Sequence, residues 1–260
     1  MKVWITGASS GMGEACAYLY ASRGDSVVVT SNEKERLDEV VAKCLSLGAA
    51  GAMALPFDLQ DSEGIADLAR QAWEAFGGLD VMYCNAGISQ RTTVEDTSME
   101  MVRKIMEINY FAPVAMAKAI LPRMLEAGGG HIAATTSIAG RFGFPLRCAY
   151  SSSKHALYGF FETLRAEYGS RGIAVTLICP GRVRTNISLY ALDKGGKAHG
   201  KMDPGQAGGL GVDAAAKKIV RAIDRGRREV LVGRKELIMV YIKRFFPGLC
   251  AKISTKIKSM

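Results

Sequence analysis

The chain has 260 residues, of which 48% are apolar, 23% are charged and 8% are aromatic. This composition is typical of a folded globular protein with a large core, and it excludes a disordered chain, a collagen and a small disulfide scaffold. The six cysteines form no Cys-x-x-Cys pair, and the three histidines lie far apart in no metal-ligand spacing. We therefore expect reduced cysteines, no metal site and a cytoplasmic protein.

The formal net charge of +9 is concentrated near the C-terminus. Residues 1–216 hold 21 Lys and Arg against 22 Asp and Glu, whereas residues 217–260 hold 13 against 3. A nearly neutral body with a basic C-terminal segment is not the pattern of a nucleic-acid-binding domain, so we expect no nucleic-acid partner. A strand pattern already begins at Lys2, so no signal or transit segment is expected, and no apolar run is long enough to span a bilayer.

Short β-branched runs alternate along the chain with segments whose apolar residues recur at helical spacing. The expected strands are residues 3–6, 27–30, 52–55, 81–84, 131–136, 173–179 and 229–232, and the expected helices are residues 11–23, 33–47, 62–76, 99–125, 150–171 and 213–225. This alternation predicts an α/β fold: one doubly wound parallel sheet of about seven strands with helices on both faces. We expect a single domain over residues 1–232, a C-terminal extension at 233–260, and ligands at the carboxyl ends of the strands.

Three glycines, Gly7, Gly11 and Gly13, lie between the first expected strand and the first expected helix. Glycines at this spacing allow a tight turn, close approach of the backbone to a pyrophosphate and close packing of helix on strand. A glycine-rich turn without a ligand is the alternative, and the position between strand and helix favours the binding turn.

Tyr150 and Lys154 stand four residues apart at the start of a long expected helix and therefore share one helix face. A phenol with a pKa of about 10 is a poor base at neutral pH, and a neighbouring ammonium group favours the phenolate. The pair fits proton transfer to a carbonyl oxygen or from an alcohol. The alternative is an ordinary surface tyrosine beside an extended lysine.

Together these motifs resemble the compact, single-domain branch of the short-chain dehydrogenase/reductase family. The residues that carry the resemblance occur in the family's order: Thr6-Gly-x-x-x-Gly-x-Gly13, Asn85-Ala86-Gly87, Asn109, Ser137, Tyr150-x-x-x-Lys154 and Pro180-Gly181. The resemblance implies a Rossmann-type fold and an oxidoreductase that transfers a hydride between a nicotinamide and a carbonyl or secondary alcohol. The C-terminal extension is similar to that of the branch containing dehydrogenase/reductase member seven.

The resemblance also implies a role for each catalytic residue. Tyr150 would give or take the proton on the substrate oxygen, and Ser137 would hold and polarise that oxygen. Lys154 would lower the pKa of Tyr150 and bind the nicotinamide ribose, and Asn109 would anchor a water in a proton relay. A catalytically silent dinucleotide-binding sensor or scaffold is the alternative function, and the four intact residues argue against it.

The cofactor residues implied by the resemblance fall into five groups. They are Gly7, Ser9, Ser10, Gly11, Met12 and Gly13 at the pyrophosphate turn, Ser31 and Asn32 at the adenosine ribose, Asp58 and Leu59 at the adenine, Asn85, Ala86, Gly87, Tyr150 and Lys154 towards the nicotinamide, and Pro180, Gly181, Val183 and Thr185 over it. Ser31 stands where NAD-preferring members have Asp, and Asn32 where NADP-preferring members have Arg. Because Ser31, Asn32 and Lys34 can accept a phosphate, the sequence favours NADP(H) over NAD(H).

On the substrate side we expect Ser137 and an apolar wall of Phe142, Phe144 and Tyr190, with a lid at residues 187–210 and a lipophilic carbonyl or alcohol substrate. The aromatic residues could equally be core. The basic, amphipathic extension has several open roles: docking on its own domain, resting on an anionic membrane, contacting a partner subunit or capping the pocket. The resemblance further implies a homodimer or homotetramer formed through the 99–125 and 150–171 helices.

Overall fold

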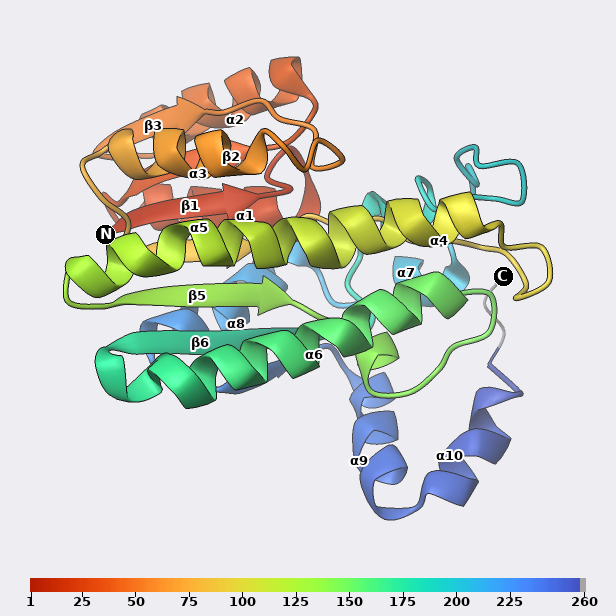
Figure 1. The fold of residues 1–260 in the computed structure, drawn as a ribbon. Coiled ribbons are helices and arrows are strands. Elements are labelled where there is room, and N and C mark those ends of the chain that lie inside the picture. Colours follow the sequence, from red (N-terminus) through yellow and green to blue (C-terminus); the bar gives the residue numbers. More distant parts are fainter. Residues whose placement is uncertain (258–260) are drawn as a thin grey trace.

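The computed structural model describes residues 1–257, which form one parallel sheet with helices on both faces (Figure 1). The strand order is β3-β2-β1-β4-β5-β6-β7, and every neighbouring pair is parallel. The strands are β1 (Lys2–Thr6), β2 (Ser26–Thr30), β3 (Gly51–Ala54), β4 (Val81–Cys84), β5 (Gly130–Thr135), β6 (Ile173–Pro180) and β7 (Glu229–Val232). The predicted doubly wound sheet is confirmed.

The helices are α1 (Gly11–Ala21), α2 (Lys34–Ser46), α3 (Ile65–Glu74), α4 (Met99–Met106), α5 (Ala112–Glu126), α6 (Cys148–Tyr168), α7 (Pro204–Ala207), α8 (Val212–Asp224), α9 (Ile238–Phe245) and α10 (Pro247–Ser254). Buried residues of α3, α5 and α6 form one core layer, and those of α1, α2 and α8 form the other. Successive strand residues point to opposite faces of a sheet, so Trp4 belongs to the first layer while Val3 and Ile5 belong to the second.

The predicted helix at residues 99–125 is divided by a π-helical turn, Glu107–Phe111, with Asn109 at its centre. Pro113 explains the break. In a regular helix the N–H of residue 113 would donate to the carbonyl of Asn109, but proline has no N–H. The backbone of Asn109 is thereby released from the regular helical pattern, as π-turns at functional sites commonly do.

The C-terminal extension forms a hairpin of α9 and α10 at the end of the molecule where the strands finish (Figure 1). Met239 and Cys250 are buried against Ile138, Phe142 and Cys179 in a separate apolar cluster. The hairpin is therefore packed on its own domain, although residues 258–260 of the predicted extension lie outside the described part. None of the helices within residues 1–257 has the length and apolar character needed to cross a membrane.

Candidate active site

A cavity of about 420 Å³ opens at the carboxyl ends of the strands on the β1 side of the sheet. Most of the predicted cofactor residues line it: Gly7, Ser9, Ser10, Gly11, Met12, Ser31, Asn32, Asp58, Leu59, Asn85, Ala86, Gly87 and Thr185. Six lining residues were not among the predicted cofactor residues, although Ile187 begins the predicted lid: Glu33, Phe57, Ile88, Ile108, Asn186 and Ile187. Most of these residues are the next neighbours in sequence of predicted ones, so extending each predicted group by one residue would have found them.

The glycine-rich turn has the geometry that its spacing predicts. Gly7 and Gly11 adopt φ values of +63° and +62°, where side chains are disfavoured. A Cβ on Gly7 would lie 2.7 Å from the Cα of Ala86, and one on Gly13 would lie 2.6 Å from the Nδ2 of Asn85. Gly13 does not line the cavity, and its role is close packing of α1 against the end of β1.

Asn85 holds this turn in place rather than only lining the cavity. Its Nδ2 donates to the carbonyls of Thr6 and Gly7 at 3.2 and 3.1 Å, and its Oδ1 accepts from the hydroxyl of Tyr83 at 3.1 Å. The side chain therefore ties the end of β4 to the end of β1. This network fixes the backbone at the place where a dinucleotide pyrophosphate would lie.

The segment that follows β2 carries a carboxylate, Glu33, that was not among the predicted cofactor residues. Glu33 lines the cavity, and its Oε2 accepts a hydrogen bond of 2.6 Å from the hydroxyl of Ser9. The hydroxyl of Ser31 accepts from the backbone N–H of Glu33 at 3.0 Å. The cavity lining after β2 therefore contains the hydroxyl of Ser31, the amide of Asn32 and the carboxylate of Glu33.

The four predicted catalytic residues are all buried, and three of them meet at the start of α6. Tyr150 and Lys154 lie on α6, with the Nζ of Lys154 5.8 Å from the centre of the Tyr150 ring, and Ser137 hydrogen-bonds to Tyr150 from the end of β5. Lys154 donates to the carbonyl of Thr135 at 2.8 Å. Tyr150 and Lys154 lie outside the lining of the large cavity.

The side chains of Asn109 and Lys154 both lie next to Gly87. A Cβ on Gly87 would lie 3.1 Å from the Oδ1 of Asn109 and 3.3 Å from the Nζ of Lys154. The amide of Asn109 is held by Ile88, whose N–H donates to Oδ1 at 2.8 Å and whose carbonyl accepts from Nδ2 at 2.9 Å. Nδ2 also donates to the hydroxyl of Ser153 at 3.0 Å. Both polar atoms of the Asn109 side chain therefore have hydrogen-bond partners. Its backbone carbonyl, in contrast, lacks the regular helical hydrogen bond because residue 113 is proline.

Burial raises the pKa of Tyr150, which is opposite to the direction expected from Lys154 alone. The hydrogen bond from Ser137 and the positive charges of Arg147 and Arg91 lower this pKa but do not offset the loss of hydration. Burial also lowers the pKa of Lys154 to about 8, against the opposing influence of Cys84. The pKa of Lys154 is therefore well below that of an ordinary lysine, as is common for residues at functional sites.

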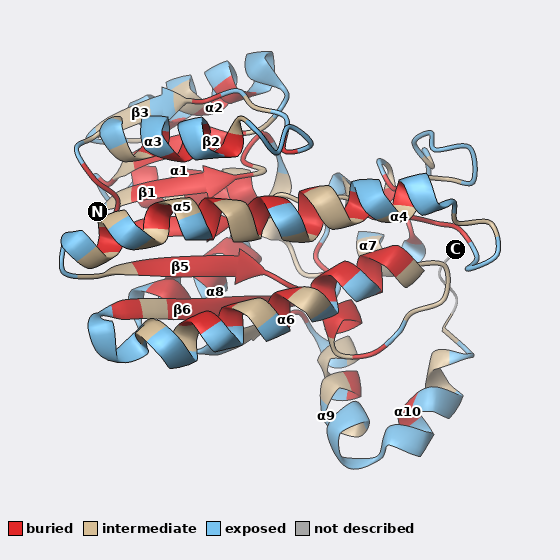
Figure 2. Cartoon of the chain, viewed as in Figure 1, coloured by how far each residue is buried: buried red, intermediate tan, exposed pale blue. Residues whose placement is uncertain are grey.

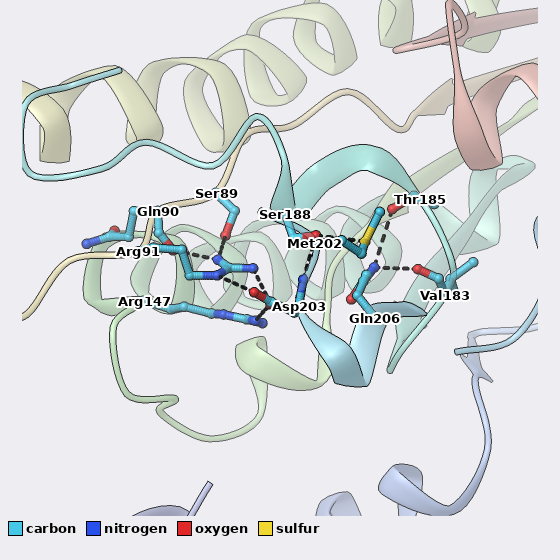
Figure 3. Close-up of polar contacts among 10 residues, drawn as sticks. All are labelled: Ser89, Gln90, Arg91, Arg147, Val183, Thr185, Ser188, Met202, Asp203 and Gln206. Atoms are coloured by element: carbon cyan, nitrogen blue, oxygen red, sulfur yellow. Dashed lines mark hydrogen bonds and ion pairs between the residues drawn. The ribbon is translucent and has the colours of Figure 1, made fainter. Parts of the chain in front are cut away.

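The two arginines belong to a buried cluster around Asp203 (Figure 3). Arg91 follows β4 and donates from Nη2 and Nε to the Asp203 carboxylate at 2.6 and 3.2 Å, and Arg147, which precedes α6, donates from Nη2 at 2.8 Å. The backbone N–H of Asp203 donates to the hydroxyl of Ser188 at 3.3 Å. Since Asp203 and Ser188 lie in the predicted lid, this cluster joins the lid to the segments beside Tyr150. Sequence reasoning missed it.

The expected substrate wall is not assembled as predicted. Phe142 is buried in the apolar cluster beneath α9 and α10, with the ring of Phe144 4.7 Å away, because the C-terminal hairpin covers this side of the loop. Tyr190 instead lines the large cavity and is 61% exposed. Of the proposed substrate residues, Ser137 alone keeps its predicted position beside Tyr150.

Three residues predicted to cover the nicotinamide do not line the cavity: Pro180, Gly181 and Val183. Pro180 is the buried last residue of β6. Gly181 faces the carboxylate of Glu236, which also accepts from the backbone N–H of Arg182 at 2.7 Å. The side chain of Val183 is buried in the core layer with α1 and α8. The sequence pattern predicted that these residues lie at or just after the end of a strand, but not whether each one faces the cavity.

Comparison with known proteins agrees with this geometry. A family model described as short chain dehydrogenase matches residues 1–194. Dehydrogenase/reductase SDR family member 7B of Mus musculus is 40% identical over 256 residues, which are 96% of this chain and 79% of the relative. The SDR family protein 7-like of Drosophila melanogaster is 36% identical over 258 residues, 98% of this chain and 79% of the relative.

Two solved structures match the fold over nearly its whole length. A short-chain dehydrogenase from Streptomyces avermitilis has a TM-score of 0.79 at 28% identity and covers 98% of this chain and 97% of its own. A short chain dehydrogenase/reductase from Burkholderia phymatum, solved in complex with NAD, has a TM-score of 0.83 at 24% identity, with 99% and 95% covered. The second likeness shows the fold alone.

Proposed function

Because the chain belongs to the short-chain dehydrogenase family of oxidoreductases, we propose that it transfers a hydride between a nicotinamide cofactor and a carbonyl or secondary alcohol. Tyr150 is the general acid and base in this proposal. The observation that carries it is the convergence of the buried Tyr150, Ser137 and Lys154 at the start of α6, within reach of the positive charges of Arg147 and Arg91.

The residues of the cavity fit a dinucleotide. The turn at Gly7 and Gly11 leaves backbone groups accessible at the N-terminus of α1, where a pyrophosphate is favoured by the helix dipole. Asp58 and Phe57 would hold the adenine end, and Thr185 would lie towards the other end. When bound, the cofactor supplies or accepts the hydride, and the chain positions it and handles the proton.

The proton is moved by the residues at the start of α6. Ser137 holds the substrate oxygen, and Tyr150 delivers its phenolic proton to that oxygen during reduction or accepts a proton during oxidation. Lys154 stabilises the phenolate that remains, and its lowered pKa lets it pass a proton on near neutral pH. The backbone carbonyl of Asn109, which Pro113 frees, anchors the water that continues this relay to solvent.

We favour NADP(H) over NAD(H) as the cofactor. The hydroxyl of Ser31 and the amide of Asn32 line the adenosine end and can donate to a 2′-phosphate. The carboxylate of Glu33 opposes this preference, because its negative charge lines the cavity and its hydrogen bond to Ser9 holds it there. A side-by-side fluorescence titration with NADPH and NADH tests the preference, and tighter binding of NADH would contradict it.

The proposed setting follows from the same features. The substrate is lipophilic, because Ile88, Ile187 and Tyr190 line the cavity, and the protein acts in the cytoplasm, since all six cysteines are free. It forms a homodimer or homotetramer through residues 99–125 and 150–171, where Phe111 is 50% exposed. The basic extension makes peripheral contact with a membrane.

Replacing Tyr150 by phenylalanine tests the catalytic assignment. The variant should bind NADPH as tightly as the wild type, while its oxidation of NADPH with a lipophilic aldehyde or ketone that the wild type reduces should fall by about 100-fold or more, since general acid catalysis contributes on this scale. Tyr168→Phe, at the opposite end of α6, is the matched control and should keep full activity. Unchanged turnover by the Tyr150 variant would refute the assignment.

A further inference from the structure

Most residues of the hairpin of α9 and α10 are exposed (Figure 2), and five of them are large apolar side chains. We call this surface the outer face, and its members are Ile238, Tyr241, Phe245, Phe246 and Leu249. Each is between 49% and 65% exposed, and Phe245 and Phe246 are the most exposed of the five. Five large apolar side chains exposed within twelve consecutive residues indicate an interaction site rather than scattered exposure.

The outer face is not needed to hold the hairpin on the domain. A different set of side chains performs that task, because Met239 and Cys250 are buried and Val240, Ile242 and Ile253 pack beside them. Along α9 the exposed residues Ile238, Tyr241 and Phe245 are spaced three and four apart, so they form one stripe that faces away from this cluster. The hairpin therefore has two apolar faces, of which one is already covered.

The charges around the outer face identify the partner. Residues 238–257 contain Lys243, Arg244, Lys252 and Lys256 and no acidic residue. All four basic side chains are exposed. Two copies of this surface placed face to face would bring eight positive charges together, which opposes self-association. An anionic surface instead offers partners for the charges and an apolar layer for the aromatic rings.

The size of the hairpin fixes how such a surface would be engaged. Each helix has eight residues and is therefore about 12 Å long, far shorter than the hydrocarbon core of a bilayer. A short amphipathic helix with aromatic and basic residues lies in the plane of the interface. Lysine and arginine side chains beside the rings can reach the lipid headgroups while the rings enter the acyl boundary.

We propose that the outer face docks the protein on an anionic lipid bilayer, with Phe245, Phe246 and Leu249 in the interface and the four basic residues against the headgroups. This deepens the membrane contact proposed above and is independent of the hydride chemistry. It also has a consequence for the active site. The inner face of the hairpin packs on Phe142 and Phe144, which lie between Ser137 and Tyr150 in the chain. The substrate side of the site is thus held close to the lipid surface.

Vesicle co-sedimentation of the full chain tests the proposal. Vesicles of phosphatidylcholine alone should bind weakly, whereas vesicles with one-third phosphatidylglycerol should bind at least tenfold more tightly, and high salt should reduce this binding. Phe245→Ser combined with Phe246→Ser should lower the partition coefficient at least tenfold. The double variant Lys243→Glu with Arg244→Glu should remove the preference for anionic lipid.

A matched control removes as much exposed apolar surface elsewhere. Leu45→Ser combined with Val94→Ser changes residues that are 51% and 78% exposed on other parts of the molecule, and it should bind vesicles like the wild type. Absence of binding, equal binding to both vesicle types, or an equal loss in the control would overturn the proposal. So would a dimer, detected by light scattering, that the Phe245 and Phe246 substitutions dissociate. Because NADPH oxidation is not measured, failure here is distinct from failure of the proposed function.

Discussion

Replacing Asp203 by asparagine removes the carboxylate that two buried guanidinium groups share. Arg91 and Asp203 have side-chain exposures of 2% and 8%, and Arg147 has 19%. Asparagine has nearly the same shape, so packing is preserved while the negative charge is lost. Its amide can accept from one arginine, but its NH₂ group then faces the other. The substitution therefore tests the negative charge of Asp203 within the cluster drawn in Figure 3.

The expected effect is large because the remaining charges stay buried. Removing one partner of a buried ion pair typically costs about 3–5 kcal/mol, since an uncompensated charge is left out of water. Here two guanidinium groups are left, and the Nε of Arg147 already has no hydrogen-bond partner among residues 1–257. At roughly 2–4 °C per kcal/mol for a domain approaching this size, the melting temperature should fall by about 6–20 °C.

Urea denaturation followed by circular dichroism measures the loss, with Asp38→Asn as the matched control. Asp38 makes an ion pair of the same kind with Lys34 at 2.7 Å, but the two side chains are 54% and 66% exposed. That substitution should cost no more than about 1 kcal/mol, as exposed pairs usually do. If Asp203→Asn costs no more than Asp38→Asn, the cluster does not hold the lid and the reasoning is refuted.

Three further substitutions test other parts of the site. Lys154→Met should remove one contribution to the pH dependence of the unfolding free energy. Because the pKa of Lys154 is lowered to about 8 in the folded protein, the folded state releases this proton at a lower pH than the unfolded chain does. The unfolding free energy of the wild type therefore rises with pH in this range. The unfolding free energy of the wild type relative to the variant should therefore rise by about 2 kcal/mol between pH 7.5 and 9.5, and a flat difference would contradict the assignment. Glu33→Gln should strengthen the binding of NADPH relative to that of NADH by about fivefold in fluorescence titrations. The substitution removes a repulsion of about 1 kcal/mol between the carboxylate and the 2′-phosphate. An unchanged ratio of the two dissociation constants would mean that Glu33 does not face the 2′-phosphate. Gly181→Ala should lower the unfolding free energy measured in urea by about 1–3 kcal/mol, since its Cβ would overlap Glu236. Gly143→Ala is the control and should be nearly neutral, because a Cβ at Gly143 meets nothing within 4 Å. Equal effects of the two substitutions would contradict this packing.

The sheet and the glycine-rich turn could be predicted because their signals are local. Each strand is a short apolar run, and the residues that follow it must lie at one edge of a parallel sheet. Gly7, Gly11 and Asp58 therefore reach the cavity without any knowledge of distant contacts. Tyr150 and Lys154 share a helix face for the same local reason. The π-turn at Asn109 was missed, although Pro113 four residues later was its signal.

The Asp203 cluster could not be predicted because its members come from three distant segments. Arg91 and Asp203 are 112 residues apart, and Arg147 and Asp203 are 56 apart. No periodicity links them, and each looks like an ordinary surface charge in its own segment. Only the path of the lid back across the end of the sheet brings them together. Predicting the sign of the Tyr150 pKa shift would have required this cluster and the degree of burial, neither of which a spacing of four residues contains.

The positions of Phe142 and Gly181 differ from the predicted ones for one physical reason, which is the C-terminal extension that begins at residue 233. Phe142 is buried because Met239 and Cys250 cover it, and Gly181 is turned from the cavity because Glu236 occupies the space beside it. The partners of Phe142 lie about a hundred residues further along the chain, so the motif that contains it gave no sign of them. The same contacts couple the hairpin to the loop between Ser137 and Tyr150. Under the proposed function, the segment that Asp203 holds and the loop that the hairpin supports are therefore the two elements that we expect to limit which carbonyl compounds reach Tyr150.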